Sequence, residues 1–297
     1  MGIASPSRVV NLLVLPVDGL APVVRALRRA KESVRLTIFR CDLPEIEKAL
    51  GAAVARGVAV HALIAETNRA GEKQLRKLEL RLLGAGITVS RTADDLVRYH
   101  DKFLVIDERL LFVFGFNFTR LDLSKRRSLA IATRKRRLVA EALALFEADA
   151  SRQDYKGGVP DFVVSPVNAR ARLEKLLSKA RESLRIYDPQ AIDPALLRLL
   201  KKKSESGVDV RILGRVGRAG SGLRAEKLPG LRLHVRAILR DDRELFIGSQ
   251  GLRTIELDRR RELGIVLRDR SAIKRFRDVF ERDWEATDAG RDEREAA

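Results

Sequence analysis

The sequence contains few of the residues that build disulfides, cysteine-based metal sites or aromatic surfaces. Of its 297 residues, one is cysteine (Cys41), three are histidine and 5% are aromatic. A lone cysteine excludes an internal disulfide and a cysteine-based metal site, so we expect a reducing, cytoplasmic environment. The aromatic residues do not alternate with the basic runs, which argues against a platform for stacking single-stranded nucleic acid.

Long apolar runs are also missing. The longest early run, residues 9–17, is interrupted by Asn11 and Pro16 and is followed by Asp18. A helix that spans a bilayer needs roughly 20 apolar residues, and neither a basic region nor a small-residue cleavage site frames this run as a signal peptide. We therefore expect no transmembrane segment, and we predict that residues 9–17 form the first buried strand.

Positive charge is in excess. The sequence has 59 Lys and Arg against 41 Asp and Glu, a formal net charge of +18. Such a surface fits nucleic-acid backbones or an anionic membrane surface, such as the inner face of a membrane. Because the basic residues are mostly arginine and are scattered along the chain, solvated faces are an equally good explanation. The 45% hydrophobic and 34% charged residues are typical of a soluble, folded protein.

The apolar pattern predicts an α/β fold. In the first half, strands over 34–38 and 58–65 alternate with helices over 20–30 and 44–56. This order favours a layered sheet with mainly parallel connections. Residues 286–297 lack apolar periodicity, so we expect a frayed tail.

The same pattern begins again after a polar linker at residues 154–160. Early matches share an offset of 150 residues and later ones an offset of 134, so the second half lacks 16 residues (150 − 134). A repeat of this length predicts two similar α-β-α lobes, residues 1–152 and 153–297, related by a pseudo-twofold axis. The matched segments are 15–18 with 165–168, 30–36 with 180–186, 57–60 with 207–210, and 145–147 with 279–281.

One motif in each half carries candidate chemistry. His100 and Lys102 lie two residues apart on a predicted strand, so their side chains share one face. Asp107 follows that strand, and the next strand leads to Gly115 and Asn117. An imidazole, a cation and an amide at one place suit nucleophilic attack on a phosphodiester.

The second copy lies 134 residues later. It contains His234, Arg236 and Asp241, followed by Gly248 and Ser249. The H-x-K-x4-D spacing, present twice with Arg for Lys in the second copy, resembles the phospholipase D superfamily, and within it the cardiolipin-synthase-like bacterial branch.

This resemblance implies an active site at the interface of the two lobes. One histidine would attack phosphorus to form a phosphohistidine, and the other would act as general acid and base. It implies no metal and no cofactor, since cations and amides of the site neutralise the phosphoryl oxygens. Asn117 and Ser249 would bind those oxygens, whereas for Asp107 and Asp241 we expect a structural role at the ends of their strands.

The two copies depart from the family pattern in different ways. The first has Phe114-Gly115 where the family often has Gly-Ser, and the second has Arg236 for Lys and Gly251 for Asn. Arg keeps the charge but its planar fork is longer. Gly251 removes an amide donor, a loss that typically costs on the order of 3 kcal/mol of transition-state stabilisation.

A carboxylate is also present in only one copy. Glu262 aligns with Ser128, and in relatives an acidic residue near this position supports the histidine of the opposite lobe. We therefore hypothesise that Glu262 supports His100, which makes His100 the nucleophile and His234 the general acid and base. A surface carboxylate that pairs with a neighbouring arginine is the alternative for Glu262.

Two further features have simpler interpretations. His61 lies inside an apolar strand and is expected to be a packed core histidine. The loop 214–222 mixes Gly with Arg and could hold phosphate oxygens, but a mobile surface loop is the simpler expectation.

Three functions fit these observations. The first is a phosphodiesterase or phosphatidyltransferase of the phospholipase D type that acts on phospholipid. The second is a metal-independent nuclease that uses the same site, which the positive charge favours. The third is a protein that binds nucleic acid or anionic lipid without catalysis, which the departures at Ser128, Arg236 and Gly251 favour.

Overall fold

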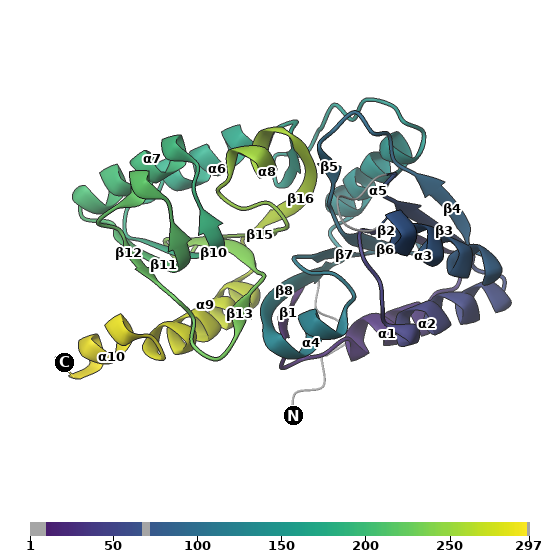
Figure 1. The fold of residues 1–297 in the computed structure, drawn as a ribbon, viewed down its shortest axis with the longest axis horizontal. Coiled ribbons are helices and arrows are strands. Elements are labelled where there is room, and N and C mark those ends of the chain that lie inside the picture. The colour runs from purple at the N-terminus through teal and green to yellow at the C-terminus, as the bar shows by residue number, and fades with distance from the viewer. Residues whose placement is uncertain (1–9, 67–71, 296–297) are drawn as a thin grey trace.

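The first of two mixed sheets is built almost entirely from the first half of the chain (Figure 1). The computed structural model describes residues 10–66 and 72–295. The strands of this sheet are β1 (Val10–Leu15), β2 (Ser33–Ile38), β3 (Ala59–Ile64), β4 (Thr88–Arg91), β6 (Phe103–Ile106), β7 (Leu110–Phe114), β8 (Arg126–Thr133) and β13 (Arg232–Leu233). They pair in the order β1-β8-β7-β6-β2-β3-β4, and β13 pairs with β8.

The second sheet repeats this arrangement. Its strands are β5 (Arg98–Tyr99), β9 (Phe162–Ser165), β10 (Ser183–Ala191), β11 (Asp209–Val216), β12 (Arg224–Glu226), β14 (Arg236–Arg240), β15 (Glu244–Gly248) and β16 (Arg260–Leu267). They pair in the order β12-β11-β10-β14-β15-β16-β5, and β9 pairs with β16. The predicted α/β class with two similar lobes is therefore confirmed.

Helices connect the strands, and equivalent helices begin and end alike. Pro44 and Pro194 lie in the first turns of α2 and α7, where proline has no amide bond to lose. Gly57 and Gly207 follow the same two helices at φ of 86° and 90°, a conformation that favours glycine. The helices are α1 (Ala21–Arg29), α2 (Pro44–Ala55), α3 (Glu72–Gly84), α4 (Arg120–Lys125), α5 (Arg136–Ala150), α6 (Ala169–Ser178), α7 (Pro194–Glu205), the 3-10 helix η1 (Arg218–Gly220), α8 (Thr254–Asp258), α9 (Arg270–Glu285) and α10 (Asp288–Glu295).

The two aspartates of the motifs anchor equivalent turns. The carboxylate of Asp107 accepts hydrogen bonds from the backbone N–H groups of residues 31–33 at 2.8–3.1 Å. Asp241 does the same with residues 181–183 at 2.8–3.2 Å. Each aspartate has φ of 49° and joins the motif hairpin to the start of the neighbouring strand. The side chains of Asp107 and Asp241 thus hold the backbone at the start of the neighbouring strand, which is a structural role.

Each half lends one short strand to the sheet of the other. β5 pairs in parallel with β16, and β13 pairs in parallel with β8. In Figure 1 these pairs lie where the purple-to-teal half meets the green-to-yellow half. Neither predicted lobe therefore contains its whole sheet, and the boundary at residues 152 and 153 stays a prediction.

The apolar core consists of a shared centre and two outer clusters. The central cluster joins Phe103 and Phe146 of the first half to Phe162, Val235 and Phe280 of the second, all fully buried. One outer cluster lies among α1, α2 and the first sheet, and the other among α6, α7 and the second sheet. Separating the halves would expose the central cluster to water, which is unfavourable.

Two equivalent buried ion pairs cross between the halves. Arg127 donates to both carboxylate oxygens of Asp283 at 2.7 Å and to the carbonyl of Leu15 at 3.0 Å. Arg261 donates to Asp149 at 2.9 Å and to the carbonyl of Ser165 at 3.3 Å. Each arginine thus joins the strand that follows one motif to the closing helix of the opposite half.

The expectation of a frayed tail is wrong for the described residues. Residues 288–295 form α10; residues 296 and 297 lie outside the described part, as does residue 9 of the predicted first strand. The hydroxyl of Thr287 accepts a hydrogen bond from Gly290 N–H at 3.2 Å. Gly290 lies so close to the end of α9 that an added Cβ would be 2.1 Å from the carbonyl oxygen of Trp284. This backbone contact holds the helix without apolar periodicity.

Within residues 10–66 and 72–295, no helix has both the length and the apolar character that crossing a bilayer requires.

We expect Asp283→Asn to lower the free energy of unfolding by about 3 kcal/mol, because breaking a buried pair leaves Arg127 without its charge partner. Urea titration followed by circular dichroism measures this change. The matched control is Asp278→Asn on the same helix, whose partner Lys274 is exposed and whose loss should matter little. Equal effects of the two variants would contradict the role of the crossed ion pair.

Candidate active site

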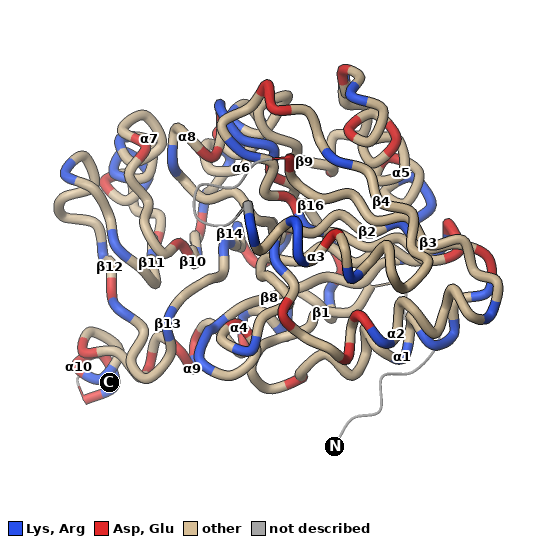
Figure 2. The backbone as a smooth tube through the Cα atoms, turned by 45° about the vertical axis from the view of Figure 1, so that its right-hand side comes forward, with Lys and Arg blue, Asp and Glu red and all other residues tan. Residues whose placement is uncertain are grey.

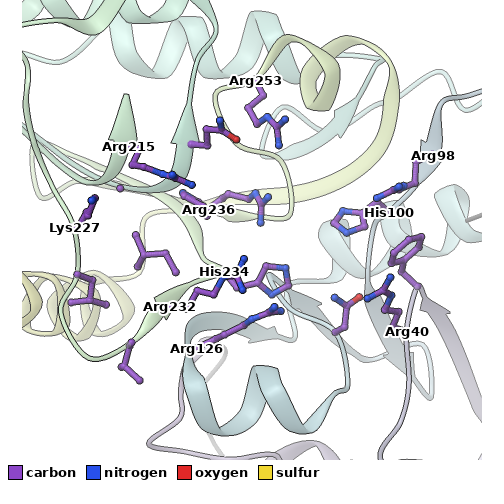
Figure 3. Close-up of a pocket in the computed structure, with 18 residues that line it drawn as sticks. Arg40, Arg98, His100, Arg126, Arg215, Lys227, Arg232, His234, Arg236 and Arg253 are labelled. Atoms are coloured by element: carbon purple, nitrogen blue, oxygen red, sulfur yellow. The ribbon is translucent and has the colours of Figure 1, made fainter. Parts of the chain in front are cut away.

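A cavity of about 650 Å³ lies between the two sheets and is lined by both motif histidines (Figure 3). His100 comes from the first half and His234 from the second, and in Figure 3 both rings border the same space. The cavity therefore lies at the interface of the lobes, where the resemblance implies the active site.

His100 is held by the second half of the chain. It directly follows β5, and its backbone N–H donates to the carbonyl of Arg261 at 2.8 Å. Its Nδ1 lies 2.9 and 3.0 Å from the two carboxylate oxygens of Glu262 on β16. The edge of its ring packs against Phe39. The structure thus brings Glu262 and His100 together, as hypothesised, and gives no support to Glu262 as a surface carboxylate, since it is fully buried.

His234 is held in the same way by the first half. Its backbone N–H donates to the carbonyl of Arg127 at 3.0 Å. Its Nδ1 lies 2.6 Å from Oδ1 of Asp122 on α4. Asp122 is fully buried and also accepts hydrogen bonds from Arg126 and Thr119, each at 2.8 Å. Both histidines therefore have a carboxylate on Nδ1.

The sequence did not predict the role of Asp122, because the residue aligned with Glu262 is Ser128. The acid comes instead from the short helix six residues earlier. One signal was available: the offset of 134 takes Asp122 to Glu256, another acid, and Arg126 to Arg260. The two halves thus carry equivalent acids on α4 and α8, and the second half has Glu262 in addition.

Lys102 and Arg236 occupy equivalent positions but lie differently. Nζ of Lys102 is 3.0 and 3.1 Å from the two ring nitrogens of His100 and donates to the His100 carbonyl at 2.5 Å. Lys102 is buried behind the histidine and is not among the residues that line the cavity. Arg236 does line it, and both of its hydrogen bonds to Glu256 measure 3.3 Å.

Burial and nearby cations favour the neutral form of both histidines by lowering their pKa values. Burial lowers the pKa of His100 well below its usual value, and the charges of Lys102 and Arg236 lower it further. Burial also lowers the pKa of His234, although the hydrogen bond with Asp122 acts in the opposite direction. Burial lowers the pKa of Lys102 to about 8, against the attraction of Glu262. A neutral imidazole is the form that attacks as a nucleophile.

The predicted phosphate-binding residues are placed unequally. Asn117 lines the cavity, but Ser249 lies against β16, where its hydroxyl accepts from Leu263 N–H at 3.2 Å. Gly251 has no amide side chain, but its backbone N–H donates to Glu256 at 2.8 Å. Of the two predicted phosphate-binding residues, only Asn117 therefore lies at the cavity wall, which also includes the side-chain amide of Gln190.

The two motif glycines allow close backbone packing. A Cβ on Gly115 would lie 3.3 Å from the carbonyl oxygen of Gly248 and 3.1 Å from that of Leu129. A Cβ on Gly248 would lie 2.7 Å from Cα of Gly264. Packing of β15 against β16 within the second sheet thus requires glycine at residue 248, whereas the close approach of the two halves leaves little room at residue 115.

Seven further cations surround the histidines. They come from both halves, and two of them, Arg215 and Lys227, belong to or follow the Gly-Arg loop at residues 214–222, which therefore borders the site. The other five are Arg40, Arg98, Arg126, Arg232 and Arg253 (Figure 3). Cations arranged in this way attract and hold an anion. Among the described residues, no group of three or more His, Cys, Asp or Glu side chains is arranged to hold a metal ion.

His61 lies away from this cavity. Its Nε2 is 2.8 Å from the hydroxyl of Ser90, and its ring packs edge-on against Phe146. Burial and the charge of Arg35 lower its pKa. The predicted packed histidine is confirmed, although it is only half-buried.

A buried acid lies between His100 and Lys102. Asp101 is 1% exposed, and neither of its carboxylate oxygens has a hydrogen-bond partner within the described part of the chain. Burial and the charge of Asp149 raise its pKa to about 8, against the attraction of Arg261. The equivalent residue of the second half is the fully buried Val235.

Comparison with known proteins agrees with this architecture. A family model described as "Cardiolipin synthase, PLD-like domain" matches residues 23–150 and 173–284, which is most of the chain. No curated protein matches the chain.

Solved structures share the fold. The chain is similar to polyphosphate kinase from Porphyromonas gingivalis, with a TM-score of 0.77, 19% identity and coverage of 94% of this chain and 52% of the kinase. It thus spans about half the length of that protein. It is also similar to phosphatidylserine synthase from Haemophilus influenzae Rd KW20, with a TM-score of 0.73, 13% identity and coverage of 96% and 88%. Likeness at these identities shows the fold.

We expect Asp101→Val to stabilise the protein more at pH 8 than at pH 5. The raised pKa means that folding favours the protonated acid, so the free energy of unfolding falls as pH rises from about 4 to about 8. Removing this unpartnered acid should therefore add about 1–3 kcal/mol at pH 8. Chemical unfolding at several pH values measures the difference between variant and wild type. A difference that does not change with pH would contradict the assignment.

Proposed function

The chain belongs to the phospholipase D-like family of cardiolipin-synthase type, and from this membership we propose that it is a phosphodiesterase or phosphatidyltransferase that acts on phospholipid. The observation that carries the proposal is the pair of histidines on one cavity, each with a carboxylate at Nδ1. A carboxylate there fixes the tautomer that leaves Nε2 with its lone pair for phosphorus or for a proton.

The first step is attack by His100. Its Nε2 forms a bond to phosphorus, the bond from phosphorus to the leaving oxygen breaks, and His234 gives that oxygen a proton. His234 must be protonated for this role. A bound phosphodiester favours the imidazolium because its negative charge raises the pKa of a nearby histidine, and Asp122 stabilises the same form. The first half thus supplies the nucleophile, His100, and the carboxylate of Asp122, while the second half supplies the general acid, His234.

The second step releases the product. His234, now neutral, takes a proton from water or an alcohol, whose oxygen attacks phosphorus as the bond to His100 breaks. Glu262 stabilises the positive charge that His100 carries while the phosphoenzyme exists. Arg236 and Asn117 lie at the cavity wall, where they can hold the phosphoryl oxygens. These groups support a reaction that needs no metal or cofactor.

A nuclease is the second candidate. The cations that surround the two histidines favour a substrate with several phosphates, because each can neutralise one backbone charge. The same cations also fit phospholipid headgroups at an anionic surface. We propose that the protein works in the cytoplasm and meets its lipid by peripheral contact with the inner face of a membrane.

Turnover in a chelator tests the function. We expect the protein to release the headgroup from phosphatidylglycerol or phosphatidylcholine in the presence of EDTA. The variant His100→Ala should lower this rate by at least about 10³-fold. Plasmid DNA is the parallel substrate. Cleavage of DNA without turnover of lipid would replace the lipid proposal by the nuclease. If neither lipid nor DNA is turned over, and His100→Ala binds them as wild type does, the protein is a binding protein without catalysis.

Trapping the intermediate tests the roles of the two histidines. With a labelled substrate and an acid-free quench, we expect the phosphoryl label on His100. In Asp122→Asn the label should stay longer, because a poorly oriented His234 activates water on the order of 10²-fold more slowly or worse. Label on His234 would reverse the assignment. Glu262→Gln is the control, since it should slow formation of the labelled protein.

A further inference from the structure

A second basic cavity lies away from the two histidines. It measures about 410 Å³ and lies between α1, β1 and the hairpin of β6 and β7. One of its residues, Arg134, directly follows β8, whereas Arg126 of the active site begins the same strand. Eight residues of extended chain separate the two arginines by roughly 25 Å. The cavity is therefore a separate site.

Six cations line this cavity, and four of them have no ion pair among the described residues. Arg275 pairs with Asp18 at 2.8 Å, and Arg109 makes a loose contact with Glu32 at 3.8 Å. The one acid in the lining, Asp107, is occupied by the backbone N–H groups of residues 31–33. The four cations without an ion pair are Arg25, Arg29, Lys31 and Arg134. Figure 2 shows the blue positions along α1.

The second half provides an internal comparison. Arg268 is the equivalent of Arg134 (134 + 134), and it is neutralised on two sides. It donates to Asp161 at 3.0 and 3.1 Å and to Glu244 at 2.7 Å. The cations equivalent to Arg25, Arg29 and Lys31 are also kept, as Lys175, Lys179 and Arg181.

In the first half, both neutralising acids are replaced. Asn11 stands at the position of Asp161, and Leu110 stands at the position of Glu244. The strand registers support both equivalences. Asn11 pairs with Ala132 across the sheet. The equivalent of Ala132 in the second half is Val266, and its N–H donates to the carbonyl of Asp161 at 2.8 Å. Leu110 pairs with Ile106 as Glu244 pairs with Arg240. The first half has thus kept the cations without the internal anions that would balance them.

Clustered cations without counter-charges repel one another, so an external anion that binds among them is stabilised. Arginine guanidinium groups match phosphate oxygens well, because their planar forks can donate two hydrogen bonds at once. We propose that this cavity is a second phosphate-binding site, which takes a phosphate group either from a soluble ligand or from the headgroup of an anionic lipid. Catalysis at the two histidines is independent of it.

The test installs the acids of the second half in the first. In the double variant Asn11→Asp/Leu110→Glu, Arg134 should gain the partners that Arg268 has. Calorimetric titration with inorganic pyrophosphate should find two sites per chain in wild type, and one of the two should bind more weakly in the variant. Binding at the second cavity should weaken at least about tenfold, which is the typical effect of losing one charge-assisted hydrogen bond. Turnover at the active site should stay as in wild type.

Vesicle binding separates the two sources of phosphate. Wild type and the double variant are compared on vesicles of phosphatidylglycerol and of phosphatidylcholine. Weaker binding of the variant to phosphatidylglycerol vesicles alone assigns a lipid headgroup, whereas a change only with pyrophosphate assigns a soluble ligand. If the double variant unfolds, Lys31→Ala/Arg134→Ala replaces it, because both side chains are exposed. Unchanged binding of both probes in a folded variant would overturn the proposal.

Discussion

The exchange of two short strands is the constraint on which the rest of the structure depends. β5 of the first half pairs with β16 of the second, and β13 of the second half pairs with β8 of the first. The backbone N–H of each motif histidine then bonds to a carbonyl of the opposite half, at Arg261 for His100 and at Arg127 for His234. These hydrogen bonds fix the backbone of each motif histidine against the opposite half, and the carboxylates at Nδ1 then orient the imidazoles.

The same exchange explains where the carboxylates come from. The strand that receives His100 carries Glu262, and the strand that receives His234 is preceded by the helix that carries Asp122. Each imidazole is thus inserted beside an acid that the other half has already buried. The crossed pairs Arg127–Asp283 and Arg261–Asp149 hold the same strands to the closing helices. The same strands therefore form the interface between the halves and hold the candidate active site, so each half supplies only part of that site.

The repeated motif made much of this predictable from sequence. The offsets of 150 and 134 residues place two histidines at equivalent positions, and the resemblance to the phospholipase D superfamily implied the pairing of Glu262 with His100. Asp122 was not predicted, because the resemblance directs attention to β8, where Ser128 stands, whereas the acid lies on α4; its only signal in the sequence is that it aligns with another acid, Glu256. Arg236 lies at the cavity wall and donates to Glu256 on α8, whereas Lys102 is buried against His100. Such packing of a charged side chain is decided in three dimensions and is not visible in the spacing of residues.

The two halves agree at residues that bind backbone groups and differ at residues near the two cavities. Residues that hold backbone are the same in both: Asp107 and Asp241 bind three amides each, and Arg127 and Arg261 reach equivalent carbonyls.

Residues at and around the two cavities differ. Near the histidines, the buried Lys102 corresponds to Arg236 of the cavity wall, and Asn117 of that wall corresponds to the buried Gly251, while Asn11 of the second cavity corresponds to Asp161. A backbone contact allows little change, because an unpaired buried amide or carbonyl is costly. A side chain at a cavity is free of that cost, so its identity reflects what the cavity holds. The unequal halves thus mark the two cavities at which we propose that this fold binds phosphate.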